Sequence, residues 1–283
     1  ETFQLLLKSG AAIDEMNCVR RHLSNIKGGQ LLRYAPHAKW FTLIISDVPG
    51  DKLEAIASGP TSADPTSFAD AWAIVEQYQL QQRLPAAVIN HLQNGLKGTV
   101  AETVKPNDPL LQNVQNHIIG SNQVALSAAA AKAKELGYTV MLQQELVTGD
   151  AAETAAAIVQ QVKQYNGHKP ACFLYGGETT VIVTGDGKGG RNQHLALCAL
   201  QHLTPDDKIT LLAAGTDGTD GPTDAAGAFA DAAILQAIDQ NKTLLTETIQ
   251  QNDAYHFFKN VNGLLKTGAT QTNVMDIIIV LLD

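Results

Sequence analysis

Two short segments rich in glycine and charge carry the side chains best suited to phosphate or hydroxyl chemistry. The first, GDGKGGRN, covers residues 185–192 and precedes an amphipathic helical pattern. A glycine loop at a helix amino end presents backbone N–H groups, and Lys188 and Arg191 add positive charge, so the segment suits a phosphate or carboxylate. The alternative is a connecting turn whose glycines only provide positive φ angles. The other expected ligand contacts of this loop are Gly187, Gly189, Gly190 and Asn192.

The same loop has the GxGxxG spacing of dinucleotide-binding sites, but the sequence favours that interpretation less. A dinucleotide site expects an acidic residue about 20 positions further on, at the end of the next strand. Here Asp206 and Asp207 precede the expected strand, and Asp217 comes too late. Nothing in the chain matches the GxxxxGK[ST] pattern, so a nucleotide P-loop is absent.

The second segment, TDGTDGPTD, covers residues 216–224 and directly follows an apolar run that predicts a strand. Three carboxylates in so short a stretch could orient a hydroxyl group, accept its proton or hold Mg²⁺ through water. The alternative is that Asp and Gly build turns and that Asp224 caps the next helix. Asp217 is closest to the strand end and is the catalytic candidate, with Thr219 and Asp220 as expected ligand contacts.

Further candidates stand elsewhere in the chain. One group lies near the start of the chain and contains Asn17, Arg20 and Lys27, followed by the glycine pair 28–29. Their hydrogen-bond donors suit an anion. A solvated basic helix face explains them equally well. The remaining candidates lie in expected loops: Asp47, Ser58, Gly59, Glu178 and Asn273. Taken by itself, Glu178 is more simply interpreted as an ordinary hairpin residue between two strands. The histidines show no HExxH or HxH spacing, so we assign no protein-held metal.

Apolar strands alternating with helices must position these residues, which predicts an α/β fold covered on both faces of its sheet. Strands are expected at 40–46, 117–121, 138–142, 171–175, 179–184, 208–215 and 275–282. Helices are expected from Asp64 onward and at 85–95, 122–136, 150–165, 191–203, 224–239 and 253–260. The irregular stretch 95–109, with its prolines and glycines, is the expected linker between two domains.

Composition limits the class of partner. The 283 residues have a net charge of −8 and no basic cluster, which argues against a nucleic-acid or anionic-membrane surface. The longest apolar runs fall short of the roughly 18 residues of a membrane span. The three cysteines are far apart and odd in number, which favours the reducing cytoplasm. The chain opens with Glu1 inside an apolar pattern, as expected of a piece of a longer protein.

Several long strings resemble the bacterial and animal family of ATP-dependent D-glycerate 2-kinases, which older usage often names hydroxypyruvate reductases. The strings are NCVRRHLSNIKGGQL, SDVPGDKLEAIASGPTSADPTSF, YGGETTVIVTGDGKGGRNQ, GTDGTDGPTDAAGA, DAYHFF and TGATQTNVMD. They occur in series from about Lys8 to the end, so the resemblance covers nearly the whole chain.

The resemblance implies transfer of the ATP γ-phosphoryl group to the 2-hydroxyl of D-glycerate, giving 2-phosphoglycerate, with Mg²⁺ as counter-ion. It implies two α/β domains: residues 1–115 as the remainder of an incomplete Rossmann-like domain, and residues 116–283 as a domain with a mixed sheet, containing the MOFRL region at about 171–282. Arg191 would clamp phosphate or the substrate carboxylate, and Asp217 would orient or deprotonate the attacking hydroxyl. The partners would be D-glycerate and ATP, and a homodimer stays open.

The chain also departs from the family pattern. Family members begin with a further stretch that contributes a lysine, so we expect this piece alone to be inactive. His194 replaces the usual glutamate after GGRNQ, and the last loop has Ala269 and Gln271 in place of Pro and Gly. Two alternatives remain: an NAD(P)H-dependent hydroxypyruvate reductase and a non-catalytic fragment.

Overall fold

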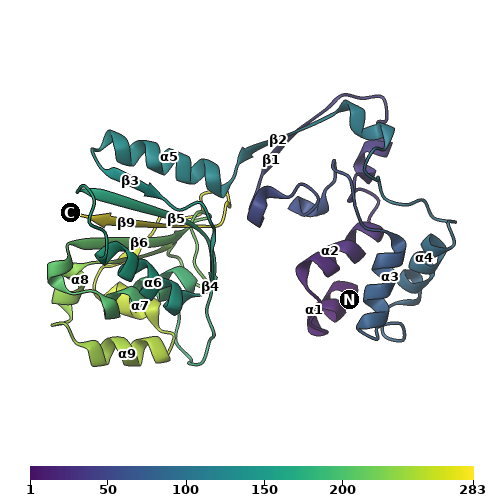
Figure 1. Cartoon of the computed structure of the whole chain (residues 1–283). Coiled ribbons are helices and arrows are strands. Elements are labelled where there is room, and N and C mark those ends of the chain that lie inside the picture. Colours follow the sequence, from purple (N-terminus) through teal and green to yellow (C-terminus); the bar gives the residue numbers. More distant parts are fainter. The chain divides into compact units, whose positions relative to one another are not determined.

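The computed structural model describes all residues from Glu1 to Asp283 and divides into two compact units. The first unit comprises Glu1–Ile44 and Gly50–Ile119, and the second comprises Ile45–Pro49 and Gly120–Asp283. Both units appear in Figure 1, where colour follows the sequence. No helix combines the length and apolar character needed to cross a lipid bilayer.

The first unit is mainly helical. Its helices are α1 (Thr2–Lys8), α2 (Ile13–His22), α3 (Phe68–Gln77) and α4 (Ala86–Leu96). Two strands, β1 (Trp40–Ile45) and β2 (Val114–Gly120), pair in a separate two-stranded sheet. Apolar side chains from the helices form one core, which includes Leu6, Val19, Phe68, Val75 and Leu92.

Helix α3 begins later than the sequence predicts. Asp64 does not cap a helix, because its buried carboxylate accepts hydrogen bonds from the N–H and hydroxyl groups of Thr66. The helix starts after Ser67, whose hydroxyl accepts the Asp70 N–H while the Asp70 carboxylate accepts the Ser67 N–H. This reciprocal capping box satisfies two backbone donors at the first turn.

The second unit is built on a seven-stranded mixed sheet. Its strands are β3 (Thr139–Leu142), β4 (Val147–Asp150), β5 (Ala171–Thr180), β6 (Ile209–Gly215), β7 (Gly227–Ala230), β8 (Leu264–Leu265) and β9 (Asp276–Leu282). The spatial order is β3-β5-β9-β6-β7-β8, and β4 also pairs with β5. Strand β9 runs antiparallel to both β5 and β6, while β3 and β4 run parallel to β5.

Helices cover both faces of this sheet, which confirms the predicted α/β class with a mixed sheet. They are α5 (Asn122–Glu135), α6 (Ala151–Lys163), α7 (Arg191–His202), α8 (Ala232–Ala237), α9 (Lys242–Gln250) and α10 (Ala254–Asn260). Alternate residues of β5 divide between two cores: Leu174 packs with Leu126 of α5, and Phe173 packs in the core that contains Leu195 of α7. Helix α7 is buried along most of its length, as its many apolar residues require.

Three sequence-based predictions for the second unit are wrong. Strand β5 runs from Ala171 to Thr180, so no separate strand forms over 179–184 and Glu178 lies in a strand, not in a hairpin. The expected helix over 224–239 is replaced by strand β7 and the short helix α8. Helix propensity is overridden there because β7 pairs with β6 and packs against α7. Helix α9 was not expected at all.

We predict that Gly176→Ala destabilises the second unit. An added methyl group would overlap the Asn122 carboxamide at the start of α5, and neither the strand nor the buried side chain can move freely. Overpacking of this kind costs about 1–3 kcal/mol of unfolding free energy. Calorimetric unfolding measures the change. Gly120→Ala is the control, because its methyl would stand 3.5 Å from Ile45, an ordinary contact; equal stability of the two variants would contradict the prediction.

Candidate functional site

The side chain of Arg191, the first residue of α7, is held by two carboxylates. Its Nε lies 2.5 Å from Asp276 Oδ2, and its Nη2 donates to Asp276 Oδ1 at 3.0 Å. Its third nitrogen, Nη1, lies 2.7 Å from Glu178 Oε1. The hydrogen bonds with Asp276 raise the pKa of Arg191, and the negative charges of Asp276 and Glu178 act in the same direction against burial. The guanidinium is therefore fixed in a bidentate pair plus one further contact.

The position of Asp276 follows from its place in the sheet. It begins β9 and stands opposite Gly177 of β5 on one side and Gly215 of β6 on the other. Asn122 donates from Nδ2 to the Asp276 carbonyl oxygen at 3.0 Å and to the Val274 carbonyl oxygen at 2.9 Å. Two glycine neighbours leave room beside the Asp276 side chain, which is only 6% exposed.

Asp217 lies on the same side of the sheet end as Asp276. A Cβ atom placed on Gly215 would be 3.0 Å from Asp217 Oδ1 and 3.5 Å from Asp276 Oδ1, so the two carboxylates flank this glycine. The Asp217 carboxylate accepts the Thr219 N–H at 3.0 Å and the Thr219 hydroxyl at 3.0 Å. The structure thus places Arg191, Asp276 and Asp217 at the same end of the sheet.

The last loop packs against the Asp217 turn. Thr270 donates its N–H to the Asp217 carbonyl oxygen at 3.0 Å and its hydroxyl to the Thr216 carbonyl oxygen at 2.6 Å. Asn273 is exposed, and its carboxamide oxygen accepts the Met275 N–H at 3.0 Å. Gln271, which stands where the family resemblance implies glycine, has a φ of 60°, so the loop keeps a conformation that glycine would favour.

The carboxylate of Asp220 accepts hydrogen bonds at the start of α7. Its carboxylate accepts the N–H groups of Asn192 and Gln193 at 3.1 and 2.8 Å, and also the Asn192 side-chain amide at 3.2 Å. Burial raises the pKa of Asp220, and the two backbone hydrogen bonds oppose that increase. A Cβ on Gly190 would overlap the Asp220 carboxylate. The negative charge expected at this helix start is therefore supplied by the chain itself.

The glycine loop, residues 185–190, is likewise held by its own chain. The Gly185 N–H donates to Asn252 Oδ1 at 2.9 Å, and the Gly187 N–H donates to the Gln251 carbonyl oxygen at 2.8 Å. The Lys188 N–H donates to Asp253 Oδ1 at 2.9 Å. These three N–H groups are therefore not free for an anion, whereas those of Gly189, Gly190 and Arg191 have no partner within the chain. Lys188 Nζ lies 4.7 Å from the ring centre of a neighbouring tyrosine, Tyr255.

A cavity of about 670 Å³ opens beside Arg191. Its charged side includes Arg191, Glu178 and Asp220, and its other lining groups are mainly apolar, hydroxyl or backbone. Gly187, Gly189 and Gly190 also line it, whereas Lys188, Asn192, Asp217, Thr219 and Asn273 do not. The cavity can accept a ligand of which one end meets the guanidinium and the remainder meets uncharged surface.

A second group of expected site residues gathers in the first unit. Arg20 Nη1 and the Ser58 hydroxyl both donate to Asn17 Oδ1, at 2.7 and 3.1 Å. Lys27 Nζ donates to the Ala57 carbonyl oxygen at 2.6 Å. Burial lowers the pKa of Lys27, and the neighbouring charge of Arg20 lowers it further. Neither cation has a carboxylate partner, so the group is suited to an anion.

We call these residues, Asn17, Arg20, Lys27, Ser58 and Gly59, the cation cluster. Ala57, Ser58 and Gly59 all have left-handed backbone, with φ of 51°, 61° and 63°. The turn persists because the Gly28 and Gly29 N–H groups donate to the Ser58 and Gly59 carbonyl oxygens at 2.9 and 2.7 Å. Asp47, by contrast, is exposed and has no side-chain hydrogen bond.

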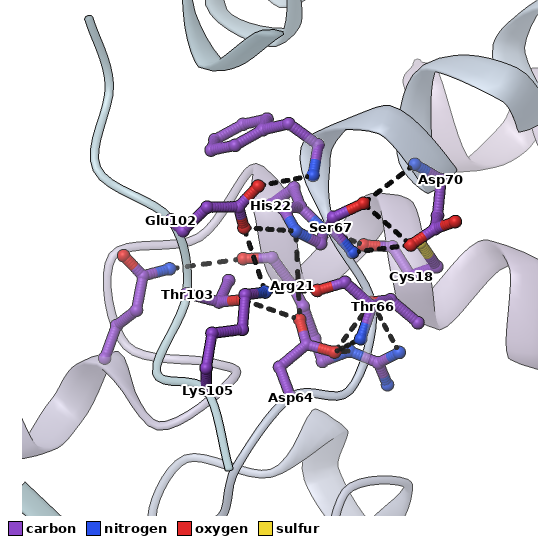
Figure 2. Close-up of polar contacts among 12 residues, drawn as sticks. Cys18, Arg21, His22, Asp64, Thr66, Ser67, Asp70, Glu102, Thr103 and Lys105 are labelled. Carbon is purple, nitrogen blue, oxygen red and sulfur yellow. Dashed lines mark hydrogen bonds and ion pairs between the residues drawn. The ribbon is translucent and has the colours of Figure 1, made fainter. Parts of the chain in front are cut away.

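A buried polar network lies next to the cation cluster (Figure 2). Asp64, fully buried, forms an ion pair with Arg21 at 2.9 Å and accepts the Thr103 hydroxyl at 3.0 Å. Glu102 lies 3.4 Å from His22 Nε2 and 2.9 Å from Lys105 Nζ. Three segments, α2, residues 64–66 and residues 102–105, are thereby joined. Because α2 carries Asn17 and Arg20, the network fixes one side of the cation cluster.

Two protein families match separate parts of this chain, and glycerate kinases of other organisms are similar to nearly all of it. Residues 1–93 match a family described as a domain of unknown function, DUF4147, and residues 171–276 match the MOFRL family. The chain is 42% identical over 284 residues to the glycerate 2-kinase of Pyrococcus horikoshii, covering 98% of this chain and 63% of that protein. It is 35% identical over 321 residues to the glycerate kinase of Macaca fascicularis, covering 96% of this chain and 80% of that protein. The chain belongs to the glycerate kinase family.

A solved structure of this family has the same fold. The crystal structure of the glycerate kinase from Thermotoga maritima superimposes with a TM-score of 0.87 at 39% identity, covering 100% of this chain and 66% of that one. The chain therefore spans slightly less than two thirds of the length of several glycerate kinase relatives.

Sequence reasoning missed important partners of the expected site residues. Asp276 could have been found, because an aspartate that begins a wholly apolar strand must be buried and needs a cation. Asn252 and Asp253, which hold the glycine loop, gave no comparable signal, since they lie more than 60 residues away along the chain.

We predict that Asp64→Asn strongly destabilises the first unit. The variant leaves Arg21 without its buried counter-charge and replaces an acceptor oxygen by a donor, a change that costs about 3–5 kcal/mol. Both tryptophans, Trp40 and Trp72, lie in the first unit, so fluorescence during urea unfolding reports on it. Asp14→Asn, at an exposed position of α2, is the control and should change the free energy of unfolding little.

The first unit should also lose stability in acid because of Glu102. Burial acts to raise the pKa of Glu102, but the hydrogen bond from the Phe68 N–H and the contacts with Lys105 and His22 outweigh burial and lower it. A depressed folded-state pKa stabilises the protein above the ordinary value, and this contribution disappears as the pH falls through the folded-state pKa. Urea unfolding between pH 3 and 6 tests this. Glu102→Gln should unfold with a weaker pH dependence, and an unchanged dependence would refute the assignment.

Proposed function

We propose that the protein to which this chain belongs transfers the γ-phosphoryl group of ATP to the 2-hydroxyl of D-glycerate, giving 2-phosphoglycerate. The observation that carries the proposal is that Arg191, which lines the cavity, is held by Asp276, and that Asp276 and Asp217 flank Gly215. Phosphoryl transfer depends mainly on positioning and charge neutralisation, which a fixed guanidinium and a nearby carboxylate can supply. Membership of the glycerate kinase family supports the same reaction.

Within this proposal, one nitrogen of Arg191 meets the ligand. Asp276 holds Nε and Nη2, and its side chain is too buried to leave. Glu178, which contacts Nη1, is 48% exposed and can rotate into solvent. An incoming phosphate or carboxylate oxygen would therefore replace Glu178 at Nη1, while Asp276 keeps the guanidinium plane oriented.

Asp217 would act on the attacking hydroxyl group. Its carboxylate has no cation partner, and its two hydrogen bonds with Thr219 fix its orientation. A carboxylate so placed can accept a hydrogen bond from a hydroxyl group and take its proton as the bond to phosphorus forms.

ATP in such reactions carries Mg²⁺, and the donors of this site fit that ion. No group of three or more possible metal-binding side chains is present. Mg²⁺, however, is commonly held by one or two carboxylates together with substrate phosphates and water. Asp217, whose carboxylate oxygens are not taken by any cation, would hold it through water, which leaves the carboxylate able to accept a proton. When bound, Mg²⁺ would neutralise charge on the phosphates.

The cation cluster of the first unit would bind an anionic group of a substrate. Arg20 and Lys27 have no carboxylate partner, and they line a smaller pocket of about 460 Å³.

We further propose that residues 1–115 are part of a Rossmann-like domain and that the protein is cytoplasmic. The three free, buried cysteines support the second of these.

The structure speaks against the alternative of a nicotinamide-dependent reductase. A GxGxxG site binds pyrophosphate through loop and helix N–H groups. Here Gln251, Asn252 and Asp253 accept three of the loop N–H groups, and Asp220 accepts those of Asn192 and Gln193 in α7, so fewer donors remain for a pyrophosphate.

We expect the complete protein to form ADP from ATP only when D-glycerate and Mg²⁺ are present. A parallel assay with hydroxypyruvate and NADH should show no NADH oxidation. Oxidation of NADH without ADP formation would refute the kinase assignment. The 283-residue chain alone is expected to be inactive in both assays.

Conservative variants of the complete protein test the two assigned roles. Arg191→Lys keeps a positive charge for Asp276 but loses the bidentate geometry, and we expect kcat/KM to fall by about 100-fold or more. Asp217→Asn removes the proton acceptor and should lower kcat by roughly 100- to 10,000-fold. Arg83→Lys and Asp186→Asn, both exposed and without side-chain partners, are the controls. Wild-type kinetics in either test variant would remove the assigned role.

A further inference from the structure

We propose that His194 is a substrate-binding residue that forms a hydrogen bond with a hydroxyl group of a ligand in the cavity of the second unit. The proposal rests on the function proposed above for the choice of ligands. The hydroxyl group belongs either to the ribose of the nucleotide or to the hydroxy acid.

The position of His194 directs it to this cavity. It lies three residues after Arg191 on α7, so the two side chains share one face of the helix. Both line the cavity. His194 thus stands beside the guanidinium that the proposed reaction uses.

The imidazole has no partner within the protein. His194 is only 9% exposed, yet neither ring nitrogen takes part in a hydrogen bond or ion pair. The fully enclosed side-chain atoms without a partner belong to other residues, namely Ser62, Asn122 and Gln193. The His194 nitrogens therefore keep access to the cavity. A ligand in the cavity can therefore give the ring a hydrogen-bond partner that the protein does not supply.

The charge of the ring favours a neutral ligand group. Burial lowers the pKa of His194, while the carboxylate of Asp150 acts in the opposite direction. A pKa below its ordinary value favours the neutral ring at pH 7, which has one N–H donor and one acceptor nitrogen. A hydroxyl group can both donate and accept, so it matches a neutral imidazole better than a phosphate does.

The cavity wall around His194 is also polar and uncharged. Thr148, Thr179 and Thr180 line the cavity with it, and Thr180 donates its hydroxyl to the Gly149 carbonyl oxygen at 3.1 Å. The cavity thus has an uncharged polar part, which includes His194, in addition to the charged part around Arg191. A ligand with an anionic group and a hydroxyl group fits both parts.

Nuclear magnetic resonance of the complete protein with ¹⁵N-labelled histidine tests the proposal. His194→Gln identifies the His194 ring signals, which are then followed during separate titrations with MgATP and with D-glycerate. We expect one of the two ligands to shift both ring nitrogens. A shift with MgATP that is lost with 2′-deoxyATP or 3′-deoxyATP assigns the ribose, and a shift with D-glycerate assigns the hydroxy acid. No shift with either ligand, although calorimetry shows that both bind, would overturn the proposal.

Kinetics give an independent readout. His194→Gln should raise KM for the assigned ligand by about 3- to 10-fold, the loss expected for one neutral hydrogen bond, with little change in kcat. His194→Phe should do at least as much. His202→Gln, exposed at the other end of α7, is the control and should behave as wild type. Unchanged KM values in both His194 variants would overturn the proposal. If a variant does not fold, the titration of the wild-type protein decides.

Failure of the proposed function has a different signature. In that case the wild-type protein would not form ADP with D-glycerate, whatever residue stands at position 194. A His194 shift in the presence of either ligand would still support the binding role, because the titrations do not require turnover.

Discussion

The ion pair between Arg191 and Asp276 determines much of the second unit. Asp276 begins the central strand β9 and is buried between two glycines, so its charge requires a cation within hydrogen-bond distance. Arg191 meets this requirement from the first residue of α7. The pair therefore fixes where helix and sheet meet, and it also orients the nitrogen that remains for a ligand. Stability and the proposed chemistry share one interaction.

The first unit also pairs a buried carboxylate with an arginine, but that arginine is not a candidate ligand contact. There the buried charges of Arg21 and Asp64 satisfy each other, and neighbouring hydroxyl groups complete the network. Arg20, the residue before Arg21, is left without a carboxylate and can meet an anion. Arg21 therefore stabilises the unit, and Arg20 remains available for a ligand. In the second unit, Arg191 does both.

Much of the fold was predictable from local signals. The apolar strands and helix α6 with its Asp150 cap follow from hydrophobic pattern and capping chemistry. The residues 224–239 were not predictable in this way, because alanine-rich sequence favours a helix until pairing with β6 imposes a strand. For the site, the motifs selected Arg191 and Asp217 as candidates. They could not show that the N–H groups of Gly185, Gly187 and Lys188 have partners within the chain, since those partners are distant in sequence and meet the loop only in the folded chain.

The place of β9 in the sheet has a consequence for how the second unit is made. This strand comes after all others in the chain, yet it lies between β5 and β6 and supplies hydrogen bonds to both. Until the ribosome has released these residues, β5 and β6 have no partner on their facing edges, and Arg191 has only Glu178 as a counter-charge. The sheet and the Arg191–Asp276 pair are therefore completed only after residues 276–282 have been synthesised. A nascent chain that stops before them leaves one edge of β5 and one edge of β6 open.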